Sequence, residues 1–426
     1  MKRTRRDFLK RFLGASGALC APLRCHAVDA SEVGKVYDGW REGEFDVHLI
    51  HTGRGEAIFH VFPDGTSMLI DAGDWKSKEK AIPPHPDDSR RPGEWVARYI
   101  RRVNPLGTDV DYMMLSHYHP DHGGRPQEGV ETAAGRGDYA ISGLAQVAEF
   151  IHFGAAFDRG YPDYETPVPV VENPTADNFR RFTAWAVKEN GMTMEKFEPG
   201  RLDQIRLRKK DAYDFHVRNL SANGIVWTGV GSDTHDFLAD YAEPAAKENP
   251  LSLSMTIQYG PFRYYTGGDL DTSIPGADGA PVPIEAAVGR AAGPVDVVKV
   301  NHHGNLNAST GEFVRSVQAR AYLCTVWTTN QPSNGSIGRV MSPDNYAGPR
   351  DYFPTLPCER RAEGLLEGAW REHLALDGGH VVLKVFDGGA RYKVYYLAAD
   401  DESMRVKAVY GPFDSTGTAR CGARRI

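Results

Sequence analysis

The sequence has few cysteines, no internal repeat and, beyond its first residues, no long apolar run. Only five of its 426 residues are cysteine, and none forms the Cys-x-x-Cys pairs typical of zinc or redox sites. No period of about 20 to 50 residues recurs, which excludes solenoids and propellers. No apolar run after the leader is long enough to span a bilayer, so we expect no stable membrane association. The chemistry of this chain therefore has to come from residues other than cysteine.

The first 27 residues are typical of an export signal. Paired arginines, Arg5 and Arg6, precede Asp-Phe-Leu-Lys, and a run of small and apolar residues follows up to Leu23. This pattern resembles the twin-arginine signal, which implies the twin-arginine translocase as a partner. We predict cleavage after Ala27, and a periplasmic or secreted mature protein, residues 28–426.

Removal of this leader makes the chain strongly acidic. The leader holds seven basic residues and one acidic residue, a net charge of +6, so the formal net charge changes from −6 to −12. Such a chain binds polyanions poorly unless a local basic groove or a metal attracts them. Its 41% hydrophobic and 25% charged residues indicate a packed globular protein. Three cysteines remain, and the sequence does not determine which pair an oxidising compartment would join.

The densest group of candidate metal ligands follows a predicted strand, Asp109–Leu115. His117, His119, Asp121 and His122 come within the next seven residues. Imidazole beside carboxylate suits zinc, with manganese or iron as alternatives. His117 and His119 are two apart on extended chain, so their side chains point the same way, whereas the other two follow at a turn and face a second metal. The pattern predicts a metal site, in preference to a histidine-rich surface loop.

A meander of strands precedes this group, over residues 45–74. Asp71 ends its last strand, where a carboxylate is well placed to orient a ligand histidine from behind. His48, His51 and His60 stand at sheet positions away from other candidate ligands. We interpret these three histidines as structural.

Two motifs in this order resemble the metallo-β-lactamase superfamily. They are Ile70-Asp-Ala-Gly and Ser116-His-Tyr-His-Pro-Asp-His-Gly-Gly. The resemblance implies an α/β fold, a four-layer αββα sandwich with a long insertion, and a di-metal hydrolase. His119 stands where the oxygen-reducing diiron branch has glutamate, so that branch is disfavoured.

The same resemblance implies roles for residues at later strand ends. Asp269, behind two glycines, matches the superfamily's bridging carboxylate, and we favour it over Asp271, for which turn-capping is the alternative. His302 and His303 follow the β-branched run 295–300. We predict His302 as the missing ligand of the second metal and His303 as a donor to the developing oxyanion. The predicted metal ligands are His117, His119, Asp121, His122, Asp269 and His302, and the predicted catalytic residues are Asp121 and His303.

The superfamily's third motif, a histidine that completes the first metal's ligands, is not obvious. Asp269 lies 147 positions after His122, so we predict an insertion over about 125–249 that builds one wall of the site. Three candidates for the missing histidine lie within it, and each is also open to a structural interpretation: His152, His216 and His235.

Three further motifs narrow the resemblance: His51-Thr-Gly-Arg-Gly-Glu-Ala, Thr266-Gly-Gly-Asp and Val298-Lys-Val-Asn-His-His-Gly. They resemble the metallo-β-lactamase-like domain of ComEC competence proteins and its free-standing relatives. Our hypothesis is hydrolysis by a metal-bound hydroxide at a dinuclear site with two divalent cations, zinc first. The substrate is a phosphodiester or a small molecule, and nucleic acid stays open. The alternatives are lactone, β-lactam or thioester hydrolysis, and a metal-binding module without catalysis.

Overall fold

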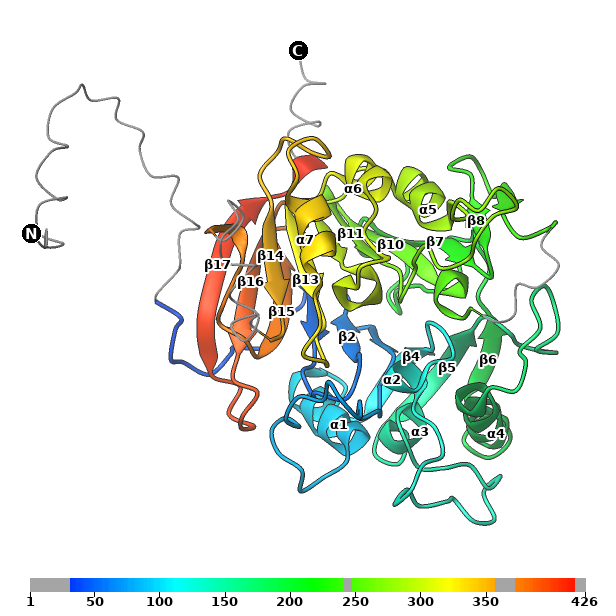
Figure 1. Ribbon diagram of the computed structural model, residues 1–426. Coiled ribbons are helices and arrows are strands. Elements are labelled where there is room, and N and C mark those ends of the chain that lie inside the picture. The colour runs from blue at the N-terminus through cyan, green and yellow to red at the C-terminus, as the bar shows by residue number, and fades with distance from the viewer. Residues whose placement is uncertain (1–30, 241–246, 357–371, 418–426) are drawn as a thin grey trace, which may run out of the picture.

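Two β-sheets pack face to face, and helices cover their outer faces (Figure 1). The computed structural model describes residues 31–240, 247–356 and 372–417. The predicted leader with its cleavage site lies outside these ranges, as do Cys358 and Cys421. None of the helices within them is long and apolar enough to cross a membrane.

The first sheet has nine strands in the order β17-β16-β15-β1-β2-β3-β4-β5-β6. Strands β3 to β6 run parallel to one another, and the other neighbours are antiparallel. The bounds are β1 (Phe45–Leu49), β2 (Ile58–Val61), β3 (Ser67–Ile70), β4 (Asp109–Met114), β5 (His152–Asp158), β6 (Thr193–Lys196), β15 (His380–Phe386), β16 (Arg391–Leu397) and β17 (Val406–Asp414).

The second sheet has eight strands in the order β14-β13-β12-β11-β10-β7-β8-β9. Strands β11 to β14 are parallel, and the remaining pairs are antiparallel. The bounds are β7 (Phe215–Ala222), β8 (Ile225–Trp227), β9 (Thr234–Asp236), β10 (Ser254–Tyr259), β11 (Phe262–Thr266), β12 (Val297–Lys299), β13 (Ala321–Cys324) and β14 (Asp351–Pro354).

Three helices pack on the outer face of each sheet, and short helical turns occupy the strand ends. Figure 1 shows α1, α3 and α4 on one side and α5, α6 and α7 on the other. The predicted four-layer αββα sandwich is therefore confirmed. The bounds are α1 (Pro92–Val103), α2 (Pro120–Gly123), α3 (Leu144–Val147), α4 (Pro174–Glu189), α5 (Ile284–Ala292), α6 (Gly311–Val317), α7 (Asn334–Met341), η2 (Asn249–Leu251) and η3 (Asn301–Gly304).

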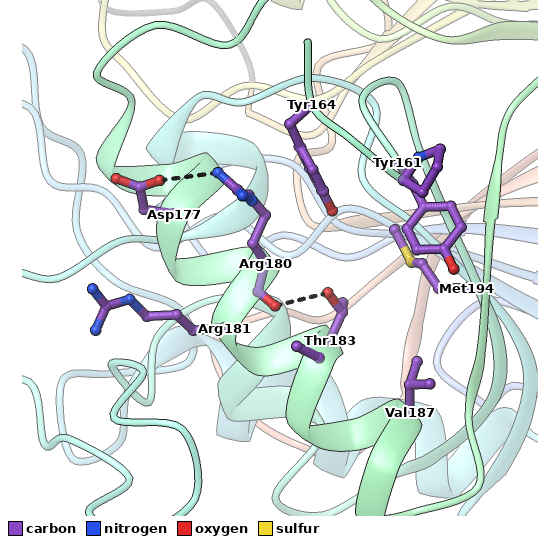
Figure 2. A pocket seen from close by; sticks show the side chains of 10 residues that line it. Tyr161, Tyr164, Asp177, Arg180, Arg181, Thr183, Val187 and Met194 are labelled. Atoms are coloured by element: carbon purple, nitrogen blue, oxygen red, sulfur yellow. Dashed lines mark hydrogen bonds and ion pairs between the residues drawn. The ribbon is translucent and has the colours of Figure 1, made fainter. Parts of the chain in front are cut away.

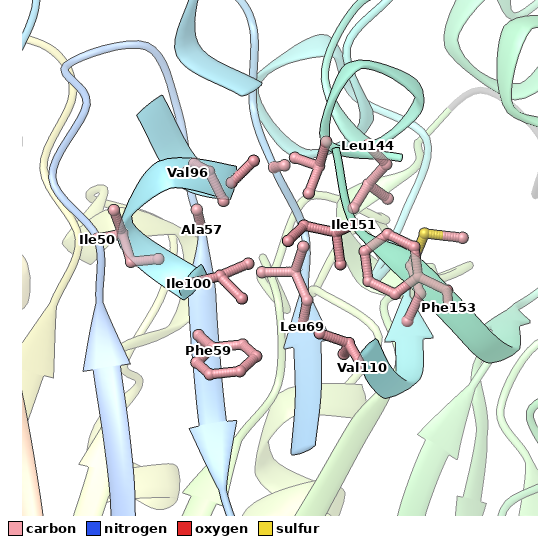
Figure 3. Close-up of a cluster of buried hydrophobic side chains, with 14 of the residues drawn as sticks. Ile50, Ala57, Phe59, Leu69, Val96, Ile100, Val110, Leu144, Ile151 and Phe153 are labelled. Carbon is pink, nitrogen blue, oxygen red and sulfur yellow. The ribbon is translucent and has the colours of Figure 1, made fainter. Parts of the chain in front are cut away.

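The strands of the meander are buried on both faces. Met68 and Ile70 point into the core between the sheets, whereas Leu69 points into the helix layer, because successive side chains of a strand alternate. In that layer, Ile100 of α1 lies against Phe59 and Leu69 (Figure 3). Burial on both faces holds the strand ends firmly, and those ends carry the polar residues described below.

Residues 125–249, predicted as an insertion that builds one wall of the site, contribute strands to both sheets. They supply β5 and β6 to the first sheet and β7, β8 and β9 to the second. Sequence periodicity missed this because several of these strands are only three or four residues long. Residues 201–214, just before β7, are irregular, and their arginines form surface ion pairs such as Arg208–Asp111.

Candidate metal centre

Polar residues from four strand ends meet at one edge of the sandwich. Asp71 follows β3 and the segment 116–122 follows β4, which are parallel neighbours in the first sheet. Asp269 follows β11, while His302 and His303 follow β12, its parallel neighbour in the second sheet. Carboxyl ends of neighbouring parallel strands lie at the same edge, so two facing sheets bring these side chains together.

Four buried side chains form the tightest group: Asp121, His122, Asp269 and His303, whose candidate ligand atoms all lie within 4.8 Å of one another. The Oδ2 atom of Asp269 is 3.2 Å from His122 Nε2 and 3.4 Å from His303 Nε2. Asp121 Oδ2 is 3.8 Å and 3.5 Å from the same two nitrogens. Ligands bound about 2 Å from one zinc ion stand roughly 3 to 4 Å apart, so these spacings match a single cation site.

The ring of His122 is held from behind by Asp71. Asp71 Oδ2 accepts a hydrogen bond from His122 Nδ1 at 2.8 Å, and the backbone N–H and hydroxyl of Ser116 also donate to this carboxylate. An ionised carboxylate only accepts, so His122 Nδ1 carries a proton and Nε2 is the ring nitrogen that faces the centre and can bind a cation. The predicted position of Asp71 behind a ligand histidine is confirmed.

A buried chain of polar groups fixes His303 in the same way. Lys299 Nζ lies 2.7 Å from Glu56 Oε2, and the Thr325 hydroxyl donates to that oxygen at 2.6 Å. The hydroxyl proton is thereby used, so Thr325 Oγ1 accepts from His303 Nδ1 at 3.0 Å. His303 Nε2 therefore also presents a lone pair and has no proton for an oxyanion.

These residues fit a divalent cation. The Nε2 atoms of His122 and His303 face each other at 3.2 Å, and Asp269 Oδ1 is buried without a hydrogen-bond partner among the described residues. Burial alone would lower the pKa of His122, but Asp269 and Asp71 outweigh it and raise that pKa well above its usual value. Burial raises the pKa of Asp121, yet His122 and His303 outweigh it and lower that pKa to about 2. The group therefore favours positive charge between its donor atoms.

A second set of donors lies beside this group. Ser116 Oγ gives its proton to Asp71, so it accepts from His117 Nδ1 at 3.1 Å, and His117 Nε2 is left as a lone pair. That Nε2 lies 3.1 Å from His119 Nδ1 and 4.0 Å from Asp269 Oδ2. Burial lowers the pKa of His117 well below its usual value, which keeps the ring neutral and able to bind a metal.

The two consecutive histidines lie at different places in this centre. The structure has His303, and not His302, in the tight group with Asp121 and His122. His302 instead lies at its margin, with Nδ1 3.2 Å from Asp271 Oδ2. Both histidines adopt left-handed backbone conformations, φ +47° and +49°, which no sequence pattern reveals.

Two glycines of the predicted motifs lie in close contact with the loop that carries Asp121. A Cβ atom on Gly73 would lie 2.1 Å from the Asp121 carbonyl oxygen, and one on Gly55 would lie 2.2 Å from it. The backbone N–H of Glu56 donates to this carbonyl at 2.8 Å. The close approach explains why glycine stands in both motifs.

The three third-motif candidates lie away from this edge. His152 is exposed at the amino end of β5, with its ring 3.1 Å from the Asn190 carbonyl. His216 pairs with Gln258 at the end of β10 that lies far from Asp269. His235 is exposed on β9, the last strand of the sheet.

A separate cleft of about 570 Å³ lies beside α4 (Figure 2). Tyr161, Tyr164 and Arg180 line it, and the Arg180 guanidinium lies 4.4 Å from the Tyr164 ring centre. Tyr164 of this cleft lies near Tyr118, with the two ring centres 6.4 Å apart. Tyr118 stands between His117 and His119 in the sequence, and its hydroxyl donates to Asp158 at 2.8 Å.

Comparisons with known proteins give distant structural likenesses only. No protein-family model and no curated protein matches the sequence. A mutant of CmlA β-hydroxylase aligns at 11% identity over 73% of this chain and 52% of its own, with a TM-score of 0.39. AbOPH, a hydrolase in the β-lactamase superfamily, aligns at 13% over 50% and 55%, with a TM-score of 0.24. A protein of unknown function from Enterococcus faecalis aligns at 11% over 72% and 69%, with a TM-score of 0.27.

The chain thus spans about half the length of the first two of these structures. Our assignment of the fold rests on the sheet order and the helix layers of this chain, and its chemistry rests on the residues at the strand ends.

Proposed function

We propose that this protein is a metal-dependent hydrolase. The observation that carries the proposal is the group of Asp121, His122, Asp269 and His303, whose lone pairs and carboxylates converge on one point. A divalent cation bound by these residues would supply a Lewis acid, which would polarise the scissile bond and make hydroxide available near neutral pH.

The chain's own residues bind and orient around this point. Asp269 Oδ2 lies 3.2 Å from His122 Nε2 and 4.0 Å from His117 Nε2, so this carboxylate would bind a cation held by either set of donors. Asp121, ionised and at the edge of the group, accepts a hydrogen bond from the attacking water and aligns it. His303 acts as a ligand rather than as the oxyanion donor, because its only proton is engaged by Thr325.

We propose two divalent cations, with zinc as the first choice. The donors are imidazole nitrogens and carboxylate oxygens, which zinc accepts readily, and manganese or iron are the alternatives. Metal analysis of the purified protein distinguishes the three elements.

The proposed substrate is a phosphodiester, on the resemblance of the motifs to the ComEC domain. The net charge of −6 for the whole chain favours a short or small substrate over a long polyanion. Lactone, β-lactam and thioester hydrolysis are the competing activities of the same centre.

The test combines metal analysis with a panel of phosphodiester, lactone, β-lactam and thioester substrates. We expect hydrolysis of one class that is lost on chelation, restored by zinc, and abolished in His122→Ala. His235→Ala changes an exposed histidine far from the centre and serves as the matched control. Full activity in His122→Ala would refute the proposal, and a metal-loaded protein that hydrolyses no class would favour the non-catalytic module.

We also propose export through the twin-arginine translocase, supported by Arg5 and Arg6 and the apolar run that follows. Fractionation of cells that express the full chain should find it in the periplasm or the medium. Replacement of both arginines by lysine should retain it in the cytoplasm, and unchanged export of that variant would contradict the proposal.

A further inference from the structure

We infer that the two consecutive histidines bind different cations. His303 belongs to the tight group, whereas His302 joins His117, His119 and Asp269 around the other cation, in the place of the missing third-motif histidine. This inference rests on the proposed metal centre and states which residue completes its second half.

The backbone turns the two rings in different directions. Both residues have φ near +50°, a conformation that residues other than glycine rarely adopt and that costs free energy at each position. The ring centres lie 6.4 Å apart at an interplanar angle of 62°. A simple continuation of β12 would have sent one ring to each face of the sheet, whereas this turn keeps both at the edge with Asp269.

His302 and His117 lie at similar distances from one oxygen of Asp269. His302 Nε2 lies 3.9 Å from Asp269 Oδ2, and His117 Nε2 lies 4.0 Å from the same oxygen. His119 Nδ1 adds a donor 3.1 Å from His117 Nε2. Asp269 Oδ2 is therefore common to this set and to the tight group, as expected of a carboxylate between two cations.

The proton of His302 is placed away from that cation. Asp271 is surrounded by donors and acts only as an acceptor, so His302 Nδ1 donates to it at 3.2 Å. These other donors to Asp271 are Asn249 Nδ2, Asn307 Nδ2, and the backbone N–H and hydroxyl of Ser273. Asp271 thus accepts a hydrogen bond from Nδ1 of His302 and orients its ring, as Asp71 does for His122.

Asn249 lies beside the same nitrogen. Its side-chain Nδ2 is 3.2 Å from His302 Nε2, a contact that a cation bound to Nε2 would replace. Its Oδ1 is buried without a hydrogen-bond partner among the described residues and is a further oxygen at this position. The sequence analysis did not single out Asn249, because a lone asparagine before a strand gives no metal-site signal.

The two halves of the centre differ in exposure. The His302 side chain is 18% exposed, whereas that of His303 is 1% exposed. We therefore expect the cation at His302 to leave first in the presence of a chelator.

The test counts cations per chain by zinc titration against a chromophoric chelator, with elemental analysis and circular dichroism as a check on folding. The wild-type chain should bind two zinc ions. The His302→Ala variant should lose the faster-leaving ion, and the His303→Ala variant should lose the slower-leaving ion. His302→Gln repeats the first result with less loss of volume. Asp271→Asn should weaken only the faster-leaving ion, by roughly 10- to 100-fold, and His235→Ala should leave both unchanged.

The inference fails if His302→Ala and His302→Gln keep two ions at wild-type affinity, or if the His302 and His303 variants lose the same ion. A wild-type chain that binds one ion also overturns it and leaves a mononuclear hydrolase in place. A chain that binds two ions as described but hydrolyses nothing overturns the proposed function and supports this inference.

Discussion

The position of a single proton on each histidine decides what these rings are able to bind. His122, His303 and His302 each give their Nδ1 proton to an oxygen on the side away from the centre. Their Nε2 atoms then point inward, although neutral histidine in water populates both tautomers. The ligand set is therefore built as much by the oxygens behind the rings as by the rings themselves.

A substitution of Thr325 tests whether the oxygen behind His303 orients its ring. Thr325→Val keeps the shape of the side chain but removes the hydroxyl that links His303 to Glu56. The Thr325 carbonyl, 3.2 Å from His303 Nδ1, remains as an acceptor, so we expect zinc affinity to fall by only about tenfold. Competition with a chelator measures this, and Thr325→Ser, which keeps the hydroxyl, should bind as the wild type does. Equal affinity in the valine variant would show that the hydroxyl does not orient the ring.

Lys299 and Glu56 form a fully buried ion pair behind the centre. Burial would lower the pKa of Lys299, but Glu56 and Asp269 outweigh it and raise that pKa, so the ammonium stays charged. Lys299→Met leaves the Glu56 carboxylate buried without its ion-pair partner, and we expect a loss of about 3 to 5 kcal/mol in the free energy of unfolding.

The double variant Lys299→Met/Glu56→Gln should recover most of that loss, because it removes both charges. Denaturant unfolding in the presence of a chelator measures folding stability without the metal. If the single and double variants were equally unstable, the loss would come from packing and not from the stranded charge.

At the scale of elements, the loop between β4 and α2 depends on its fit against neighbouring segments. Gly73→Ala would place a methyl group 2.1 Å from the Asp121 carbonyl, so the loop has to move. We expect zinc binding to fall at least tenfold, since Asp121 and His122 move with it. Gly338→Ala, in α7 with open space around its Cβ position, is the matched control and should bind zinc normally. Unchanged zinc affinity in Gly73→Ala would mean that the loop adapts without cost.

Long elements with a clear period were predicted well. The strand predicted over 109–115 corresponds to β4, and the meander predicted over 45–74 contains β1, β2 and β3. The sequence analysis missed α5 and α6, which are short and rich in small or mixed residues. Their positions follow from the need to cover the second sheet, which is a property of the assembled layers.

For the whole molecule, buried neutral histidines set the response to acid. Burial lowers the pKa of His48, His60 and His380 to about 3. Unfolded histidine has a pKa near 6.5, so between about pH 6 and pH 3 the unfolded chain binds protons that the folded chain does not. Stability is therefore fully present above pH 6.5 and falls as the pH decreases, by about 1.4 kcal/mol per pH unit for each group.

Urea unfolding between pH 7 and pH 5, with a chelator to remove the effect of metal release, measures this dependence. His60→Leu should reduce the change in unfolding free energy per pH unit by roughly the contribution of one histidine. His235→Gln, at an exposed position, should leave this pH dependence unchanged. A slope that did not respond to His60→Leu would contradict the assignment. The interpretation of His48, His51 and His60 as structural is supported by their burial outside the group of candidate ligands.

The sequence by itself determined where the candidate ligands stand. A run such as His117 to His122 after a buried strand is a local pattern, and parallel strands carry their carboxyl ends to one edge. Tertiary structure decided which histidine serves which position, because the turn at His302 and His303 depends on packing around η3. It also supplied the supporting groups: Glu56 and Thr325 are 269 positions apart, a distance over which no spacing rule acts, and only the packing of the two sheets brings them together.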